Sequence, residues 1–265
     1  MKSPLRYPGG KSRAVKHILP HFPEDITEVC SPFLGGGSVE LALAEKGVWV
    51  YGYDTFEPLI WFWRALLGSP DALANEADSL RKYKDYYYGY RGLPKEDFNL
   101  IKEELRNEKK YSLQNAAKFY ALNRSSFSGA TLSGGWSKRA SYERFTDSSI
   151  TRVREFSQPK LYVAAQHFKH SIPAHPKTFL YLDPPYLLGK DRENLYGDAG
   201  SKHKGFDHAG LVNILRERDN WILSYNNCPE ILKLYEGYDI IYPDWKYGMS
   251  SNKDSKEVLI INKKG

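Results

Sequence analysis

Short apolar runs alternate with amphipathic segments at the start of the chain, and this pattern predicts an α/β fold. Residues 26–30 (ITEVC) and 48–53 (VWVYGY) each predict a strand. Residues 38–46 (SVELALAEK), between them, have helical composition, and Gly47 can end that helix. A strand, a helix and a strand in this order form a βαβ unit, which implies parallel strands and a right-handed crossover.

The last third of the chain continues this alternation and then departs from it. Residues 178–182 and 221–225 predict two further buried strands, with a helix between them that Asp207 can cap. Residues 238–242 and 258–261 predict a final pair of strands. Because no clear helix separates this pair, we expect the two strands to run antiparallel at one edge of the sheet.

The segment at residues 62–165 is different, because it is polar, charged and rich in tyrosine. It predicts helices at 95–106 and 113–122, irregular structure at 125–149, where Ser, Gly and Arg are frequent, and a strand at 161–164. We therefore expect a doubly wound α/β sheet interrupted by a mainly helical insertion. The expected boundaries are 1–61 and 166–265 for the sheet domain and 62–165 for the insertion.

Composition narrows the class of protein. The 265 residues include 38 Lys and Arg against 32 Asp and Glu, a net charge of +6 that suits a polyanionic partner and equally suits an ordinary basic protein. Cys30 and Cys228 are far apart and offer neither zinc spacing nor a disulfide framework, so we expect no metal. No run has the length of a signal peptide or a membrane span, which predicts a soluble intracellular protein.

Three consecutive glycines, Gly35 to Gly37, stand between a predicted strand and a predicted helix. Glycines let the backbone approach a ligand, and a helix N-terminus offers free N–H groups. The strict dinucleotide fingerprint would need a glycine at position 40, which is Glu40, so a NAD site is disfavoured. Asp54 ends the next strand, where a carboxylate can accept hydrogen bonds from ribose hydroxyls. This arrangement favours a nucleoside site over a structural turn beside a solvated acid.

The stretch 178–190 (TFLYLDPPYLLGK) places an acid, two prolines and an aromatic directly after a buried strand. Prolines cannot donate backbone hydrogen bonds, so the strand must end there in a rigid turn that holds Asp183 and Tyr186 at the sheet edge. The Asp183 carboxylate and the Pro184 carbonyl can both accept hydrogen bonds from an amino group, and Tyr186 can stack on a flat ring. Such groups can orient a planar amine toward an electrophile.

Lys11 follows a glycine turn near the N-terminus (YPGGKS, residues 7–12). A phosphate-binding loop would need a glycine at position 5, which is Leu5, and a preceding strand, and the sequence has neither. Two interpretations of Lys11 stay open: a fixed cation near the mouth of the sheet, and an exposed terminal lysine.

Five pieces of the sequence occur in the order seen in Dam-type DNA adenine methyltransferases: YPGGK, FLGGGSVEL, YGYD, LNRSSFSG and DPPY. The chain resembles that family from Tyr7 to the loop at 250–252. The resemblance implies a Rossmann-like methyltransferase sheet that carries a helical target-recognition domain. It also implies S-adenosylmethionine as methyl donor, with no metal, and a flipped adenine in a short double-stranded DNA site as acceptor.

The resemblance also implies roles for single residues. It assigns catalysis to Asp183, Pro184 and Tyr186. It assigns cofactor binding to Tyr7, Lys11, Phe33, Gly35, Gly37, Asp54, Phe168 and Asp183. It places the start of the DNA-recognition hairpin at LNRSSFSG, which contains Phe127 and Ser128. The basic side chains of the insertion, among them Arg124, Lys138 and Arg139, suit contacts to DNA phosphates, and a solvated loop stays the alternative for each of these residues. Among these, Phe127 is the candidate wedge for the space left by a flipped base, and Ser128 and Arg139 are candidates for reading base edges.

Two positions depart from the pattern of the family. Many relatives have an acid before the PF pair, where this chain has Ser31. The ammonium group of the donor's methionine part would then need another acceptor, and Asp183 is the obvious candidate. His167 also stands where many relatives carry an acid. We expect His167 to be a packing or solvated residue, because methyl transfer from a sulfonium does not require a strong base.

Two other functions stay open on the sequence. The same DPPY motif could methylate RNA or a protein glutamine amide, or the chain could be a catalytically silent DNA-binding module. For the favoured function we expect double-stranded DNA as partner, a cognate restriction endonuclease as a candidate second partner, and a monomer or weak dimer. We also expect no membrane contact and a location in the cytoplasm or at the DNA of the host cell.

Overall fold

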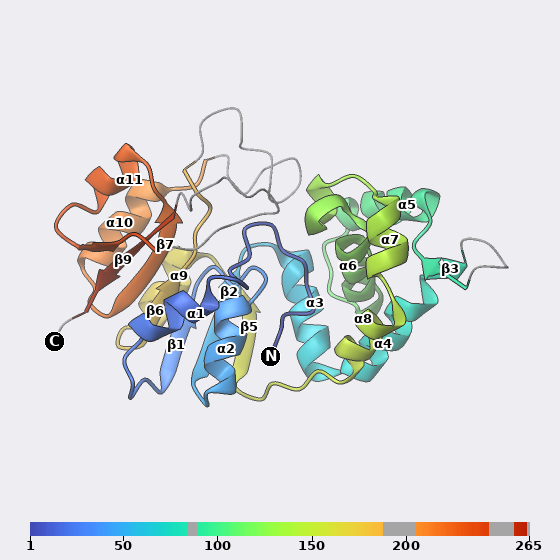
Figure 1. The fold of residues 1–265 in the computed structure, drawn as a ribbon, viewed down its shortest axis with the longest axis horizontal. Helices are drawn as coiled ribbons and strands as arrows, with labels where there is room; N and C mark the ends of the chain where they lie inside the picture. Colours follow the sequence, from blue (N-terminus) through green and yellow to red (C-terminus); the bar gives the residue numbers. More distant parts are fainter. Residues whose placement is uncertain (84–88, 188–204, 244–256, 264–265) are drawn as a thin grey trace.

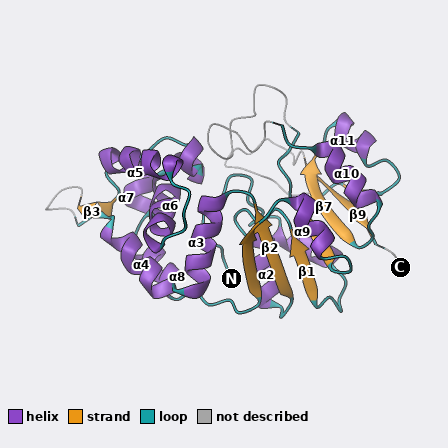
Figure 2. Cartoon of the chain, turned by 180° about the vertical axis from the view of Figure 1, so that it is seen from behind, coloured by secondary structure: helices purple, strands orange, loops and turns teal. Residues whose placement is uncertain are grey.

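The computed structural model describes residues 1–83, 89–187, 205–243 and 257–263. A sheet unit and a helical unit lie side by side, with the N-terminal segment between them (Figures 1 and 2). Among the described residues, no helix combines the length and the apolar character needed to cross a membrane. The loop at 250–252, which ended the expected family resemblance, lies outside the described residues.

The sheet has seven strands in the order β5-β2-β1-β6-β7-β9-β8. Their bounds are β1 (Glu28–Ser31), β2 (Trp49–Asp54), β5 (Leu161–Ala165), β6 (Phe179–Leu182), β7 (Trp221–Asn226), β8 (Asp239–Ile241) and β9 (Glu257–Asn262). The pairs from β5 to β7 are parallel, and β9 pairs antiparallel with both β7 and β8. The predicted βαβ unit and the predicted antiparallel pair are thus confirmed.

Helices cover both faces of this sheet. They are α1 (Val15–Ile18), the 3-10 helix η1 (Leu19–His21), α2 (Ser38–Glu45), α9 (Phe168–Ala174), α10 (His208–Arg216) and α11 (Pro229–Leu234). Alternate strand residues face opposite sides: in β6, Phe179 and Tyr181 contact Phe22 in the core that includes α2, whereas Leu180 and Leu182 belong to the core that includes α9 and α10. As predicted, the side chain of Asp207 caps α10 by accepting a hydrogen bond from Gly210 N at 2.8 Å.

The helical unit is built around one buried helix, α6 (Leu113–Ser125). Around it lie α3 (Glu57–Gly68), α4 (Pro70–Ser79), α5 (Lys95–Asn107), α7 (Lys138–Arg144) and α8 (Asp147–Arg154), with a two-stranded sheet of β3 (Lys82–Tyr83) and β4 (Arg91–Gly92) at its edge. The buried residues of α3 and α6 belong to the same core as one face of the large sheet. The two units therefore share a hydrophobic core.

The prediction of irregular structure at 125–149 was wrong for part of that stretch. Residues 126–136 do form a loop, which is closed by a bridge between Ser126 and Trp136 and contains the 3-10 helices η2 (Phe127–Gly129) and η3 (Thr131–Ser133). Helix α7 then begins because the Ser137 side chain accepts a hydrogen bond from Ala140 N at 3.2 Å. Phe145, Ile150 and Val153 anchor α7 and α8 in the core.

The structure also differs from the expected limits of the insertion, 62–165. The helical unit begins with α3 at Glu57, because the Asp54 side chain accepts a hydrogen bond from Phe56 N at 2.9 Å and turns the chain into that helix. At the other end, β5 pairs with β2 and therefore belongs to the large sheet. The helical segment accordingly runs from 57 to 154.

Candidate active site

The glycine loop follows β1 and leads into α2. Gly35 and Gly37 have φ values of 48° and 65°, the left-handed region that favours glycine. A Cβ atom at Gly37 would also lie 2.8 Å from the Trp63 ring. The indole of Trp63 donates a hydrogen bond to Gly35 O at 3.1 Å, so α3 fixes the loop from outside. The loop keeps bare backbone toward the cavity because side chains there would be strained or would collide.

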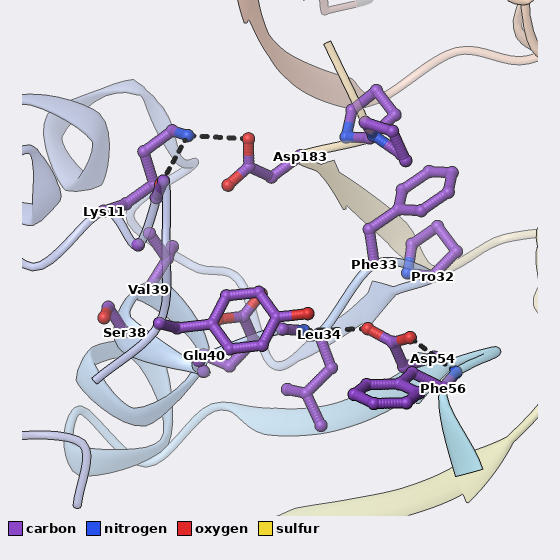
Figure 3. A pocket seen from close by; sticks show the side chains of 18 of the residues that line it. Lys11, Pro32, Phe33, Leu34, Ser38, Val39, Glu40, Asp54, Phe56 and Asp183 are labelled. Carbon is purple, nitrogen blue, oxygen red and sulfur yellow. Dashed lines mark hydrogen bonds and ion pairs between the residues drawn. The ribbon is translucent and has the colours of Figure 1, made fainter. Parts of the chain in front are cut away.

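Asp54 holds the same loop from the end of β2. Its Oδ2 accepts a hydrogen bond from Gly35 N at 3.1 Å, and its Oδ1 accepts one from Phe56 N at 2.9 Å. Figure 3 shows this half-buried carboxylate at the cavity wall. Each carboxylate oxygen can accept a second hydrogen bond, so Asp54 can shape the loop and still bind a ligand diol.

Aromatic rings line one side of the cavity. Phe33 lies 5.7 Å from Phe168 and 5.7 Å from Phe206, and Phe168 lies 5.4 Å from Phe206. Phe168 begins α9, where the preceding residue, His167, caps the helix by accepting a hydrogen bond from Lys169 N at 3.2 Å. His167 also lies at the cavity, and its ring is 4.4 Å from that of Phe168. The ring cluster offers an apolar wall against which a planar group can pack.

The DPPY segment meets the glycine loop because β6 pairs with β1. The Asp183 carboxylate accepts a hydrogen bond from Lys11 Nζ at 2.7 Å, and Lys11 is buried, at 3% exposed. Enclosure of the Asp183 carboxylate raises its pKa to about 6, although Lys11 lowers it and nearby Glu257 raises it further. The carboxylate is therefore mostly ionised at neutral pH and close to the range in which it can take up a proton.

Tyr186 is held by contacts on both its ring and its hydroxyl group. Its hydroxyl donates to Glu257 Oε1 at 2.6 Å, and its ring stacks on Tyr225 with a centroid distance of 5.9 Å. Lys11 Nζ lies 4.9 Å from the centroid of the Tyr186 ring and 3.7 Å from Glu257 Oε1. A network of Lys11, Asp183, Tyr186 and Glu257 thus orients the acid and the ring together.

One cavity, open to solvent, brings these groups together. Its lining includes every residue for which the sequence predicted catalysis or cofactor binding: Tyr7, Lys11, Phe33, Gly35, Gly37, Asp54, Phe168, Asp183, Pro184 and Tyr186. The cavity lies at the carboxyl ends of β1 and β6, where the strand order reverses. This is the position at which open α/β sheets bind ligands.

The predicted DNA contacts lie in the helical unit, and most of them are exposed. Phe127 is 72% exposed, and Ser128, next to it, has a φ of 53°. Lys138 and Arg139 stand exposed in the first turn of α7, and Arg139 Nε pairs with Glu143 Oε2 at 2.9 Å. These four side chains are accessible to a partner.

Arg124 differs from the expectation of a DNA contact, because it is buried. Its guanidinium donates hydrogen bonds to the backbone oxygens of Arg144 and Pro4. Burial lowers the pKa of Arg6 to about 10, and the nearby Arg144 and Arg124 guanidinium groups lower it further. Arg124 therefore stabilises the fold at the base of the 126–136 loop and contributes positive charge there.

Sequence reasoning missed several residues at or beside these sites, and three of them, besides the aromatic residues Phe206 and Trp63, make specific polar contacts or lie buried there. Asn123 accepts a hydrogen bond from Arg6 N at 3.0 Å and donates to Arg6 O at 2.7 Å, which ties the N-terminal segment to the helical unit. Glu257 contacts Tyr186 as described above. Glu40 lies buried beside the glycine loop. Only Glu40 carried a local signal, as an acid within an otherwise apolar helix.

Among the described residues, no group of three or more His, Cys, Asp or Glu side chains is arranged to hold a metal ion. The glycine loop lets the backbone approach a ligand, the Asp54 carboxylate can accept hydrogen bonds from a ribose diol, and the ring cluster can pack against a planar base. Together these groups suit a nucleoside.

Comparison with known proteins points to one family. The sequence pattern of the D12 class N6 adenine-specific DNA methyltransferase family matches residues 7–249. The type II methyltransferase M1.LlaDCHI of Lactococcus lactis subsp. cremoris is 22% identical over an alignment 279 residues long that covers 97% of this chain and 94% of the relative. The type II methyltransferase M.CviBI of Paramecium bursaria Chlorella virus NC1A is 22% identical over 248 residues, 90% of this chain and 88% of the relative.

Proposed function

This chain belongs to the D12 class N6 adenine-specific DNA methyltransferase family, and we propose that its cavity between β1 and β6 holds S-adenosylmethionine and a flipped adenine together. The enzyme is a DNA adenine N6-methyltransferase of Rossmann-like fold. The observation that carries the proposal is the convergence of the glycine loop and the DPPY turn on one cavity, from positions more than a hundred residues apart.

The glycine loop side of the cavity fits the donor. We assign binding of the ribose hydroxyls to Asp54 and packing against the adenine ring to Phe33 and Phe168. Gly35 and Gly37 let the backbone of the loop come close to the donor. Tyr7 packs against this loop, because Cβ atoms at Gly35 and Gly36 would lie 3.0 Å and 2.7 Å from its side chain. When bound, S-adenosylmethionine supplies a methyl group on a positively charged sulfur.

The DPPY side fits the acceptor. An exocyclic amine is a poor nucleophile, because its lone pair is delocalised into the ring. The Asp183 carboxylate and the Pro184 carbonyl can each accept one of the two amine hydrogens, which localises the lone pair, and the Tyr186 ring can stack on the base. With a pKa of about 6, Asp183 is ionised at neutral pH and able to accept the proton that the amine loses. Lys11 keeps Asp183 in the charged form.

The helical unit and the segment joined to it supply a surface for duplex DNA. Arg6, Arg124 and Arg144 crowd positive charge near the 126–136 loop, and a phosphate backbone would relieve their mutual repulsion. We assign phosphate contacts to Lys138 and Arg139. Exposed Phe127 is the candidate wedge, because an apolar side chain that is 72% exposed suits insertion between bases.

A substrate panel tests this function. The full-length protein is incubated with methyl-labelled S-adenosylmethionine and, separately, with mixed duplex DNA, structured RNA and a glutamine-containing protein fraction. The proposal predicts label in duplex DNA, recovered as N6-methyladenine after nuclease digestion. Label in RNA or protein alone would favour the other amino-methyltransferase functions. Donor binding without transfer to any substrate would indicate a catalytically silent protein.

A further inference from the structure

Glu40 is a buried acid at the wall of the cavity. It stands in the first turn of α2, directly after the glycine loop, and its side chain is 2% exposed. Its Oε1 accepts a hydrogen bond from Ser31 Oγ at 2.6 Å, and Ser31, at the end of β1, is fully buried. Glu40 is among the side chains that surround the cavity in Figure 3.

The charge of Glu40 is poorly compensated in the free protein. Burial raises the pKa of Glu40 to about 7, and neighbouring Asp183 raises it further, whereas the Ser31 hydrogen bond and the more distant Lys11 lower it. The Lys11 ammonium is bound to Asp183 at 2.7 Å and lies 3.7 Å from Glu257. In the part of the chain that the structure describes, no Lys, Arg or His side chain makes an ion pair with Glu40. A buried carboxylate of this kind favours a cationic ligand.

Three carboxylates line the described part of the cavity, and two of them already bind N–H groups of the protein. Asp54 holds the backbone N–H groups of Gly35 and Phe56. Asp183 holds Lys11 and faces the position assigned to the acceptor amine. Glu40 accepts hydrogen bonds from the Ser31 hydroxyl and from its own backbone N–H, and within the described ranges no positively charged side chain lies at contact distance from it.

We propose that the Glu40 carboxylate binds the α-ammonium group of S-adenosylmethionine, with Ser31 holding the carboxylate in position. This inference rests on the proposed function, since it assigns a contact to the donor of that reaction. It replaces the expectation that Asp183 serves this ammonium, because Asp183 already has a cation of its own. Glu40 on α2 thus supplies the negative charge that Ser31 on β1 lacks, at the position where many relatives carry an acid.

Isothermal titration of three ligands tests the proposal. S-adenosylhomocysteine carries the ammonium and the carboxylate, its decarboxylated analogue carries the ammonium alone, and 5′-methylthioadenosine lacks both. Glu40→Gln keeps the size and the polar contact to Ser31 but removes the charge. It should weaken binding of both ammonium-bearing ligands by about ten- to a hundredfold and change binding of 5′-methylthioadenosine by less than about twofold.

Glu45→Gln is the matched control, because Glu45 ends the same helix at 46% side-chain exposure and pairs with the N-terminus. It should bind all three ligands as the wild type does. Should Glu40→Gln fail to fold, Glu40→Asp retains the charge on a shorter arm and should lose affinity for the ammonium-bearing ligands only. Unchanged S-adenosylhomocysteine binding, or equal weakening of all three ligands, would overturn the inference.

The pH dependence gives a second readout. The groups near the Glu40 carboxylate are Ser31 on β1, Lys11 in the N-terminal segment and Asp183 after β6, and His167 also lines the cavity. Since Glu40 must be ionised to bind an ammonium, wild-type affinity for S-adenosylhomocysteine should fall as pH drops below about 7, relative to 5′-methylthioadenosine at the same pH. Glu40→Gln should remove this relative decline, and its persistence would overturn the inference.

The proposed function and this inference fail in different ways. A wild-type protein that binds none of the three ligands would defeat the proposed cofactor and the inference together. A wild-type protein that binds S-adenosylhomocysteine tightly and methylates DNA, with Glu40→Gln unchanged in both, would defeat only the role of Glu40.

Discussion

Removal of the Lys11 charge should move the pH dependence of methyl transfer toward higher pH. Lys11 Nζ donates to the Asp183 carboxylate at 2.7 Å, and the pKa of Asp183 is about 6 with this contact present. A hydrogen bond to a charged group contributes about 1.5–3 kcal/mol. One pKa unit corresponds to about 1.4 kcal/mol, so Lys11→Met should raise the pKa of Asp183 to between about 7 and about 8. The variant is nearly isosteric and does not add a polar group.

The assay is single-turnover methylation of a duplex with the donor already bound, measured from pH 5 to pH 9. Prior binding of the donor keeps the titration of Glu40 out of the rate. The ionised form of Asp183 is the active form, so the wild-type rate should fall below about pH 6, and the variant rate should fall below about pH 7 or 8. At pH 6.5 the variant should be slower by about three- to twenty-fivefold, and at pH 9 the two rates should approach each other.

Lys16→Met is the control, because Lys16 is an exposed lysine of α1. It should leave the pH profile unchanged. If Lys11→Met lowers the rate by the same factor at every pH, or leaves the acid limb at about pH 6, then Lys11 does not set the ionisation of Asp183 and the electrostatic account of the site is wrong.

Three further predictions concern the DNA surface and the buried acid. Phe127→Ala should slow methylation by about tenfold and reduce 2-aminopurine fluorescence at the target position, and a mismatch opposite the target should restore the rate because less unstacking is then needed; full activity on matched duplex would remove Phe127 as a wedge. Lys138→Ala and Arg139→Ala should each reduce the slope of log affinity against log salt by about 1, and an unchanged slope would take that residue out of the interface. Burial raises the pKa of Glu40 from the ordinary 4.5 to about 7. The contribution of Glu40 to the free energy of unfolding is therefore fully present below about pH 4.5 and is lost as pH rises through about 7. In urea unfolding of the free protein, the stability of Glu40→Gln relative to wild type should therefore grow by roughly 3 kcal/mol between pH 4.5 and pH 8, and a difference independent of pH would show that Glu40 keeps its ordinary pKa in the fold.

Local patterns in the sequence were sufficient for most of the fold. The strands around the glycine loop and the helix between them were predictable because Gly47 and the change from apolar run to helical composition mark their ends. The α7 helix was missed although its Lys, Arg, Ala and Glu residues favour a helix, because it is only seven residues long and follows a stretch rich in Ser and Gly. Its start depends on the Ser137 cap, and its position depends on Phe145, which packs into a core formed by distant segments.

The same distinction applies to the site. Asp54 and Asp183 could be identified because each directly follows a strand whose end must lie at the ligand edge of the sheet. The pairing of Lys11 with Asp183 spans 172 residues, and the contact of Tyr186 with Glu257 spans 71, so neither is contained in any motif. Burial of Arg124 likewise follows from the N-terminal segment that packs over it. Such contacts depend on tertiary packing.

The role of the Asp183 carboxylate in methyl transfer is tested by single-turnover methylation with Asp183→Asn, followed by digestion of the duplex and quantification of N6-methyladenine. Asparagine keeps the shape of the side chain but removes the negative charge that accepts from the adenine amine. If Asp183 acts as proposed, the variant's rate should be lower by about a thousandfold or more, with donor and DNA affinities within a few fold of wild type. Transfer by Asp183→Asn within about tenfold of the wild-type rate would contradict this role.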